Sequence, residues 1–209
     1  MNIAIIGSGN VGKALASASI RAGHNVTLSA ADPENARQAA AATGGAAAAS
    51  NREAAQAGEV VLLAVPFAAV DGILDEIQDL VAGKVLVDIT NPTKADGSGL
   101  LFVGSSAAEA IQAKVPAARV VKALNTVLAA RMRHPEGDGT TLDGFMAGDD
   151  ADAKTAVGAY LASLGLRPLD AGPLPMAQAL EALAYLNISL QMRYGWTWQT
   201  GWKLLGPTG

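Results

Sequence analysis

Cysteine is absent from this sequence of 209 residues, and histidine occurs only as His24 and His134. Without cysteine the chain cannot form disulfide bonds, iron–sulfur clusters or thiolate zinc sites, and it has no thiol for catalysis. Two isolated histidines provide neither a His-rich metal site nor a Ser–His–Asp arrangement. We predict that His24 is structural and that His134 lies in solvent. The missing cysteine fits a reducing compartment, so we expect a cytoplasmic protein.

Basic residues and long apolar runs are also scarce. The 15 Lys and Arg residues are outnumbered by 19 Asp and Glu residues, which gives a formal net charge of -4. Proteins that bind nucleic acid are usually basic, so we expect no nucleic-acid partner. No apolar stretch reaches about 18 residues without a charge or a helix breaker, so we expect no membrane span. Residues 1–7 lack the basic start and the long apolar core of a signal peptide.

Short apolar runs alternate with helical patterns along most of the chain. Residues 2–6 form an apolar run that ends in glycine, as expected of a buried parallel strand. Val11, Ala14, Leu15 and Ala18 then follow at helical spacing. The same reasoning predicts strands at 26–28, 46–49, 59–65, 84–89, 119–124 and 166–170. It predicts helices at 33–43, 70–81, 151–164 and 178 to about 202, a short helix capped by Ser50 and Glu53, and loops at 95–106 and 135–144.

This alternation is typical of right-handed βαβ units, which place consecutive strands parallel in one sheet. We therefore predict an α/β fold with a Rossmann-type, doubly wound, mainly parallel sheet and a C-terminal helical tail. No linker divides the chain. We expect residues 1–209 to form a single domain, of which residues 173–209 are a C-terminal helical extension.

The run Gly7-Ser8-Gly9-Asn10-Val11-Gly12 has the G-x-G-x-x-G spacing of a dinucleotide-binding loop. It follows a predicted strand and opens a predicted helix, the context in which this spacing is informative. Gly7 would make the tight turn, Gly9 would let the backbone approach a pyrophosphate, and Gly12 would let helix and strand pack closely. The helix N-terminus would offer free N–H groups to the anion. The loop predicts an NAD(P)-binding domain, and a flexible turn without a ligand is the alternative.

The end of the second predicted strand determines the contact with the adenosine ribose. NAD-preferring sites place an acid there, whereas this chain has Ser29-Ala30-Ala31. Asp32 has the spacing of that acid, but the proline after it also fits a helix N-cap. No Arg stands in this turn to bind a 2′-phosphate, although Arg37 could reach in from the next helical turn. Both roles of Asp32, and both NADP and NAD, stay open at this point.

Ligands of open parallel sheets bind beyond the carboxyl ends of the strands. Here those ends read Val65-Pro66-Phe67, Asp88-Ile89-Thr90-Asn91-Pro92 and Ala123-Leu124-Asn125-Thr126. They offer one aromatic ring and small polar groups, which suit a nicotinamide–ribose better than acid–base hydrolysis. Asp88 could instead be structural, and Asn125 and Thr126 are better candidates for ligand contact. We find no obvious proton donor for hydride transfer to a carbonyl, whereas transfer to a flavin-like ring can take its proton from solvent.

Six segments in this order resemble a known family, at residues 7–16, 22–27, 61–66, 120–126, 148–150 and 165–174. Together they are similar to the NADP-dependent oxidoreductases that use the deazaflavin coenzyme F420, and to the related reductase domain of the STEAP metalloreductases. The resemblance covers nearly the whole chain. Its last segment, Gly165 to Leu174, is the most specific, because generic Rossmann proteins lack it.

The resemblance implies NADP as cofactor and coenzyme F420, or a related flavin, as hydride partner. It implies that the pyrophosphate contacts Ser8, Gly9, Asn10 and Val11, that the nicotinamide side contacts Val65, Pro66, Phe67 and Asn91, and that the deazaflavin side contacts Asn125, Thr126 and Val127. It assigns no catalytic residue and no metal. The family carries Ser-Arg where this chain has Ala30-Ala31, which leaves the preference for NADP over NAD open.

Three functions follow from these observations. The first is an NAD(P)-dependent oxidoreductase that passes hydride to or from a deazaflavin or flavin. The second is a reductase of a small carbonyl or imine, although such enzymes carry a helical domain larger than the roughly 35 residues that follow Pro173. The third is a nucleotide-sensing domain without turnover, which the sparse acid and base groups would allow.

Two groups of side chains carry further predictions. Five of the 15 basic residues lie between positions 114 and 133, and we predict that this segment helps to anchor the acceptor's phosphate tail. They are Lys114, Arg119, Lys122, Arg131 and Arg133. All three tryptophans, with many large aliphatic residues, lie in the tail from Leu180 onward. Because monomers rarely expose such patches, we expect a homodimer built on the C-terminal helix.

Overall fold

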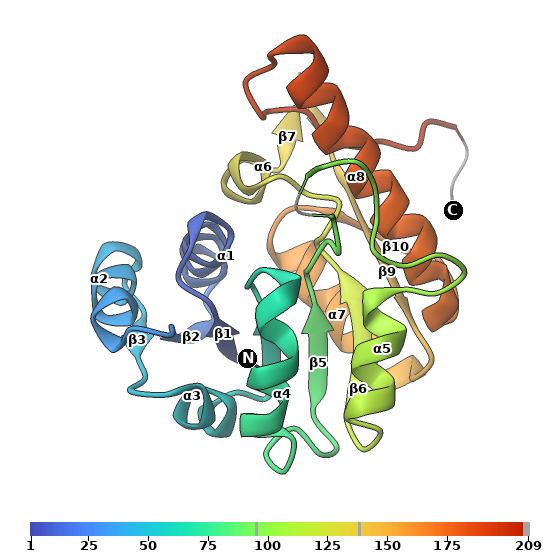
Figure 1. Cartoon of the computed structure of the whole chain (residues 1–209). Helices are drawn as coiled ribbons and strands as arrows, with labels where there is room; N and C mark the ends of the chain where they lie inside the picture. Colours follow the sequence, from blue (N-terminus) through green and yellow to red (C-terminus); the bar gives the residue numbers. More distant parts are fainter. Residues whose placement is uncertain (95, 138, 207–209) are drawn as a thin grey trace.

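The computed structural model of the chain describes residues 1–94, 96–137 and 139–206. Its main sheet has eight strands in the order β10-β9-β6-β5-β4-β1-β2-β3 (Figure 1). These strands are β1 (Asn2–Ile6), β2 (Asn25–Ser29), β3 (Ala46–Ala47), β4 (Val60–Leu63), β5 (Val85–Asp88), β6 (Arg119–Ala123), β9 (Asp143–Gly148) and β10 (Arg167–Asp170). The helices are α1 (Asn10–Arg21), α2 (Pro33–Thr43), α3 (Asn51–Ala57), α4 (Val70–Ile77), α5 (Ala107–Lys114), α6 (Ala129–Arg133), α7 (Ala151–Ser163) and α8 (Ala177–Tyr194), with short 3-10 turns η1 (Phe67–Ala69) and η2 (Leu174–Met176).

The directions of the strands confirm the predicted mainly parallel sheet. Neighbouring strands from β3 through β2, β1, β4 and β5 to β6 are all parallel. Only β9 is antiparallel to its neighbour β6, and β10 runs parallel to β9. The chain moves outward from β1 to β3 on one side and from β4 to β6 on the other. The crevice beyond the carboxyl ends of β1 and β4 is therefore the switch point at which such sheets bind ligands.

Helices cover both faces of this sheet. Successive residues of β1 point to opposite faces, so that Ile3 and Ile5 enter one core and Ala4 and Ile6 the other. The first core also contains buried residues of α1, α2 and α7, and the second contains residues of α3, α4, α5 and the start of α8. This arrangement confirms the doubly wound, Rossmann-type fold that the sequence predicts.

Side chains cap two helices as the sequence predicts. The Asp32 carboxylate accepts a hydrogen bond of 2.9 Å from the N–H of Glu34, and a proline opens α2. The Ser50 hydroxyl accepts one of 3.2 Å from the N–H of Glu53, whose carboxylate accepts one of 2.7 Å from the N–H of Ala49. The bonds from the N–H groups of Glu34 and Glu53 satisfy donors that a helix start leaves free. Asp32 is thus the N-cap of α2.

Three predicted boundaries are wrong. Helix α4, predicted to run from 70 to 81, ends at Ile77. Helix α8 ends at Tyr194, well before residue 202, because Gly195 takes a left-handed conformation with φ 61°. Strand β9 begins inside the predicted loop 135–144, which also holds a small hairpin of β7 (Glu136–Gly137) and β8 (Thr140–Thr141). The glycines at 144 and 148 give β9 a weak strand signal, and its pairing with both β6 and β10 overrides it. Asp138 lies outside the described residues.

Helices α5 and α6 are additions to the predicted pattern. At the start of α5, the Ser106 hydroxyl accepts a 3.2 Å hydrogen bond from the N–H of Glu109 and donates one of 2.8 Å to its carboxylate. This S-x-x-E spacing is a helix-start signal that the sequence does contain. In the predicted loop 95–106, residues 96–106 form no helix or strand, apart from a single bridge between Leu100 and Thr93. Ala95 lies outside the described residues.

After α8 the tail returns to the sheet and is tied to Asp143, a buried residue of β9. The N–H of Asp143 donates to the carbonyl of Trp202 at 3.0 Å. Its carboxylate accepts hydrogen bonds from Arg167 at 2.7 Å, from the N–H of Leu204 at 2.6 Å and from Lys203 at 3.2 Å. Burial alone would raise the pKa of Asp143, but these donors outweigh it and hold the pKa below its ordinary value.

Two further predictions concern the division into domains and the absence of a membrane span. The division into one domain with an extension from residue 173 stays a prediction. In the part of the chain that the structure describes, no helix is long and apolar enough to cross a membrane.

Candidate functional site

The glycine-rich loop connects the end of β1 to the start of α1. Gly7 has φ 119°, and a Cβ there would lie 2.2 Å from the carbonyl oxygen of Ala64, the residue directly after β4. A Cβ at Gly12 would lie 1.9 Å from the carbonyl oxygen of Gly7. Gly9, the N-cap of α1, faces open space, and no side chain caps this helix. Two glycines thus allow close backbone packing, and the third leaves the helix start open to an anion.

A first cavity of about 740 Å³ extends from this loop toward the end of β2. Its lining includes Gly7, Ser8 and Gly9 from the loop and Ala30 and Ala31 after β2. Polar residues that the sequence analysis did not assign to the nucleotide site also line it, namely Asn35, Ser50, Asn51 and Glu76. The size and position fit the adenosine half of a dinucleotide.

This first cavity has an acidic rather than a basic lining. Asp32 and Glu76 are its charged residues, and no Lys or Arg of the described chain lines it. Arg37 is paired with Glu34 at 2.7 Å in an exposed contact. Ser29 is buried and donates a hydrogen bond of 2.9 Å to Asn51. The pocket therefore has no preformed cation for a 2′-phosphate.

A second cavity of about 300 Å³ continues the groove across the carboxyl ends of β1, β4 and β5. It shares Gly9, Ala64, Val65 and Pro66 with the first cavity. A third cavity of about 330 Å³ shares Asn10, Val11, Ile89 and Asn91 with the second. We call this third space the ring cavity. The three cavities form one continuous groove from the end of β2 to α8, which is the shape that an extended dinucleotide and a second ligand require.

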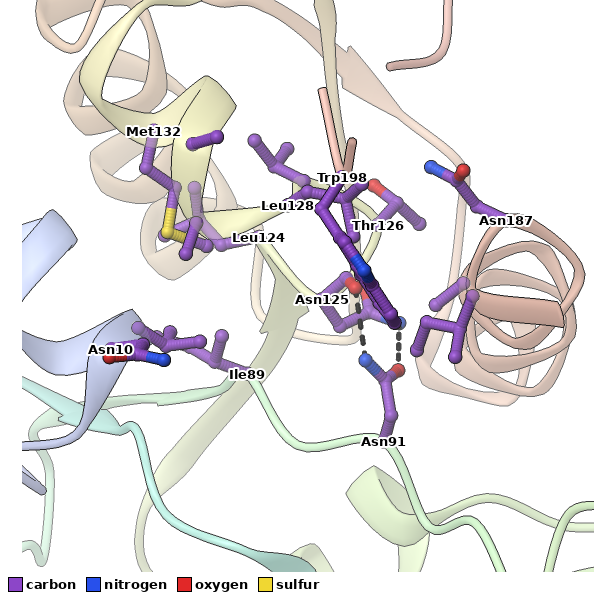
Figure 2. Close-up of a pocket in the computed structure, with 16 residues that line it drawn as sticks. Asn10, Ile89, Asn91, Leu124, Asn125, Thr126, Leu128, Met132, Asn187 and Trp198 are labelled. Atoms are coloured by element: carbon purple, nitrogen blue, oxygen red, sulfur yellow. Dashed lines mark hydrogen bonds between the residues drawn. The ribbon is translucent and has the colours of Figure 1, made fainter. Parts of the chain in front are cut away.

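The ring cavity lies between the start of α1, the segments that follow β5 and β6, helix α6, helix α8 and the tail after α8. Figure 2 shows Asn10 and Ile89 on one side, Trp198 and Asn187 on the other, and Met132 above. The remaining lining is mostly apolar, with Asn91, Asn125 and Thr126 as its polar members and Val11, Leu124, Val127, Leu128, Ala129, Ala130, Ala184 and Ile188 as its apolar ones. Of the described residues that line it, none is Asp, Glu, His, Lys, Arg or Tyr. The cavity thus offers contact area and amide groups but no acid or base.

Asn91 and Asn125 form a pair at the floor of the ring cavity. Asn125 donates a hydrogen bond of 3.0 Å to the side-chain oxygen of Asn91, and Asn91 donates one of 3.1 Å to the carbonyl of Asn125 (Figure 2). Asn125 also donates to the carbonyl of Leu180 on α8 at 3.0 Å. These bonds fix the ends of β5 and β6 against α8.

Several buried polar atoms of the ring cavity have no hydrogen-bond partner in the described chain. They are Oδ1 of Asn125, Oγ1 of Thr126 and Nδ2 of Asn187. Buried polar atoms are normally paired, because an unpaired one costs about 1–3 kcal/mol. All three atoms have almost no exposed surface, so they lie within the wall of the ring cavity and not on its open face.

Below the ring cavity lies a fully buried ionic cluster. The Lys122 ammonium of β6 lies 2.8 Å from Oδ2 of Asp88, 2.8 Å from Oε1 of Glu181 and 2.6 Å from the carbonyl of Thr90. All three charged side chains have at most 1% of their surface exposed. Burial raises the pKa of Glu181, and Lys122 opposes that rise. Asp88 is thus paired inside the fold and does not line the groove, as its structural alternative predicted.

Most of the predicted site residues line the groove, and three do not. Gly12 packs against Gly7, Ser29 is hydrogen-bonded below the surface, and Phe67 packs edge-on against Phe102 with ring centroids 5.4 Å apart. Sequence reasoning missed the α8 and tail residues, above all Asn187 and Trp198. Their long separation from the glycine loop leaves no local signal.

The predicted basic segment supplies much of the ring cavity's wall, but none of its five basic side chains lines that cavity. Lys114 is paired with Asp71 and Asp75, and Lys122 belongs to the buried cluster. The anchoring role of Arg131 and Arg133 on α6 stays a prediction. Of the histidines, His24 bonds Ser163 on α7 at 2.8 Å, and His134 is exposed.

Comparison with known proteins gives the groove a family context. A family model described as NADP oxidoreductase, coenzyme F420-dependent, matches residues 2–92. The F420-dependent NADP reductase of Methanothermobacter marburgensis is 30% identical over 210 residues, which cover 92% of this chain and 93% of that protein. The chain belongs to this oxidoreductase family.

Two further proteins are similar to this chain. A crystal structure of a proposed F420-dependent NADP reductase from Arthrobacter sp. FB24 superimposes with a TM-score of 0.85 at 32% identity, over 92% of this chain and 94% of that one. The metalloreductase STEAP3 of Rattus norvegicus is 32% identical over 181 residues, or 87% of this chain. The chain spans only 36% of the length of STEAP3. The family that the sequence motifs indicated is thus confirmed.

Proposed function

We propose that this protein transfers a hydride between NADP(H) and the ring of a deazaflavin, coenzyme F420, or of a related flavin. The relatives that align along nearly their full length are named for this pair of coenzymes. The continuous groove supports the proposal, because it joins an open helix start for a pyrophosphate to a separate cavity for a second ring.

The lining of the ring cavity is the observation that carries the choice of acceptor. Reduction of a carbonyl or imine needs a positioned proton donor, and no residue lining this cavity is an acid, a base or a tyrosine. A flavin-like ring can exchange its proton with solvent, so it needs contact area and hydrogen bonds instead. Apolar walls with a few amide groups provide both.

In this proposal the residues act by binding and orientation. The loop from Gly7 to Gly12 holds the pyrophosphate, Val65 and Pro66 border the nicotinamide, and Asn125, Thr126 and Val127 contact the acceptor ring. The nicotinamide supplies or accepts the hydride at its C4 carbon. The residues that line the groove would hold the two coenzymes next to each other, which turns a bimolecular encounter into a step within one complex. No residue of the chain is assigned a catalytic proton transfer.

A spectral assay tests this function. Oxidation of NADPH and of NADH is followed with coenzyme F420, FMN, FAD and a small cyclic imine as separate acceptors. We expect turnover with F420 or a flavin and none with the imine. Turnover with the imine alone would favour the carbonyl or imine reductase, and nucleotide binding without any turnover would favour a sensing domain.

The proposal includes a homodimer. The outer end of α8 and the following turn expose large apolar side chains, among them Met192 at 70% and Tyr194 at 58% exposure. Deletion of α8 would not test this interface, since it also removes the buried residues Leu180 and Glu181. Light scattering on the wild type and on the double variant Leu186→Glu/Met192→Glu tests it directly. A monomeric wild type, or a dimer that persists in the variant, would contradict this interface.

The proposal also includes a cytoplasmic location, in which the cellular pool of reduced nicotinamide is available. Fractionation of the source cells with an antibody to the protein tests this point.

A further inference from the structure

Trp198 is one of two strained residues at the ring cavity. Among the described residues, only Leu124 at φ 64° and Trp198 at φ 59° have a positive φ without being glycine. Both line the ring cavity. A bulky residue rarely adopts this conformation, and such strain gathers at functional sites where surrounding contacts enforce it. The concentration of both outliers in one cavity points to a function for the tail.

A buried polar network on α8 holds Trp198 in place. Gln191 accepts a hydrogen bond of 2.9 Å from the N–H of Trp198 and donates one of 2.7 Å to the Thr200 hydroxyl. Thr200 donates one of 2.6 Å to Asn187, which also accepts one of 3.1 Å from Gln191. Gln191 and Asn187 are both buried. The backbone before and after Trp198 is thus fixed from inside, so the position of its ring is not that of a free tail.

The indole of Trp198 closes the ring cavity on the side away from the nucleotide groove. Asn10 and Ile89, which Figure 2 shows on the opposite side, are shared with the groove that would hold the nicotinamide, and so is Asn91, which lies near the Trp198 ring. In Figure 2 the Trp198 ring points from the tail into the space between α8 and the Asn91–Asn125 pair. Trp198 remains 46% exposed, so part of its ring is available to a ligand.

We propose that Trp198 is the stacking platform for the acceptor ring and a specificity-determining residue of this site. The inference rests on the proposed function and adds a residue of the tail to it. An acceptor ring in the cavity would lie between the nicotinamide and the indole, with the nicotinamide on one face and Trp198 on the other. An extended aromatic face gains from such stacking, whereas a small carbonyl or imine offers no comparable face. Trp198 therefore selects for planar ring acceptors.

Three single variants test the proposal. Trp198→Ala removes the indole, Trp198→Phe replaces it with a smaller ring, and Trp196→Phe is the matched control. Trp196 is similarly exposed at 44%, but it stacks on Tyr194 at 5.2 Å and does not line the cavity. Alanine and phenylalanine carry a Cβ as tryptophan does, so neither variant relieves the backbone strain at position 198. The dissociation constants of NADP+, coenzyme F420 and FMN are measured for each protein.

We expect Trp198→Ala to raise the dissociation constants of F420 and FMN roughly 10-fold or more, while that of NADP+ changes less than about 2-fold. Trp196→Phe should match the wild type. The emission of the bound F420 or FMN provides an independent readout, because indole in van der Waals contact quenches flavin-like rings and phenylalanine does not. Bound ring should be dark in the wild type and in Trp196→Phe, and bright in Trp198→Phe.

The outcomes separate the two proposals. Unchanged affinity in Trp198→Ala, or a bound ring that stays dark in Trp198→Phe, overturns the role of Trp198 and leaves the proposed function intact. A wild type that binds neither F420 nor FMN overturns both. If Trp198→Ala is misfolded, as judged by a loss of NADP+ binding, the emission of Trp198→Phe decides.

Discussion

Lys122 offers the sharpest test of how the fold supports the groove. Its ammonium has three partners, Asp88, Glu181 and the carbonyl of Thr90, and it is fully buried. Lys122→Met keeps the length of the side chain but leaves two carboxylates buried without their counter-ion. Removing one partner of a buried ion pair typically costs about 3–5 kcal/mol. With an unfolding slope of about 3 kcal/mol per molar urea, the midpoint should fall by roughly 1–2 M.

The pH dependence of this loss gives a second readout. Burial and the charge of Asp88 raise the pKa of Glu181, and Lys122 lowers it. When Lys122 is removed, the remaining charge of Asp88 raises the pKa of Glu181 without opposition from a cation. A carboxyl whose pKa is raised on folding contributes stability at low pH and loses that contribution as pH rises through the folded pKa. We therefore expect the deficit of Lys122→Met to be larger at pH 8 than at pH 5.5.

Glu181→Gln is the matched control. The cluster holds two carboxylates and one ammonium, and Oε2 of Glu181 has no partner. An amide keeps the shape and an acceptor for Lys122 while removing the excess charge, so its cost should stay within about 1 kcal/mol. A loss below about 1 kcal/mol for Lys122→Met, or an equal loss at both pH values, would refute this account of the cluster.

Three further predictions concern the groove and the tail. Gly9→Asp should abolish binding of NADPH and NADH, because it places a carboxylate at the open start of α1. The circular dichroism spectrum of this variant should match that of the wild type. Unchanged affinity in a titration would refute the assignment of the cofactor. The wild type should discriminate only weakly between NADP and NAD, with a modest preference for NADP, and Ala31→Arg should tighten NADPH binding by about 1–3 kcal/mol. A wild-type affinity a hundredfold higher for NADH than for NADPH would contradict this prediction. Asp143→Asn should loosen residues 203–204 and cost about 1–3 kcal/mol at pH 7. Since the pKa of Asp143 is lowered on folding, this difference should shrink as pH falls through the folded pKa. Equal proteolysis of the two tails would count against this prediction.

The first two cavities of the groove are predictable from local sequence. The apolar run of β1, the spacing of Gly7, Gly9 and Gly12 and the caps at Asp32 and Ser50 all act within a few residues of one another. Parallel strands then bring their carboxyl ends to one edge by geometry alone, which places Val65, Asn91 and Asn125 along one groove. These positions are predictable because each depends on local backbone preferences and on the regular spacing of apolar residues, which is visible in the sequence.

The wall of the ring cavity that α8 and the tail form depends on contacts that no local pattern reveals. Strand β9 exists because β6 and β10 pair with it, and its antiparallel direction is a property of the whole sheet. The Gly195 cap ends α8 and turns the tail, and Asp143 holds that tail from more than fifty residues away in sequence. Trp198 therefore reaches the cavity through long-range packing.

The sequence by itself determined the α/β class, the nucleotide loop and the family, since repeated strand and helix periods and one glycine motif carry that information locally. The tertiary structure alone decided that Lys122, Asp88 and Glu181 share one buried cluster and that Trp198 faces Asn10 and Ile89 across the ring cavity. The physical reason is that burial and pairing of polar groups are collective. A lysine or tryptophan carries no mark of its partner until distant segments pack together and remove the water between them.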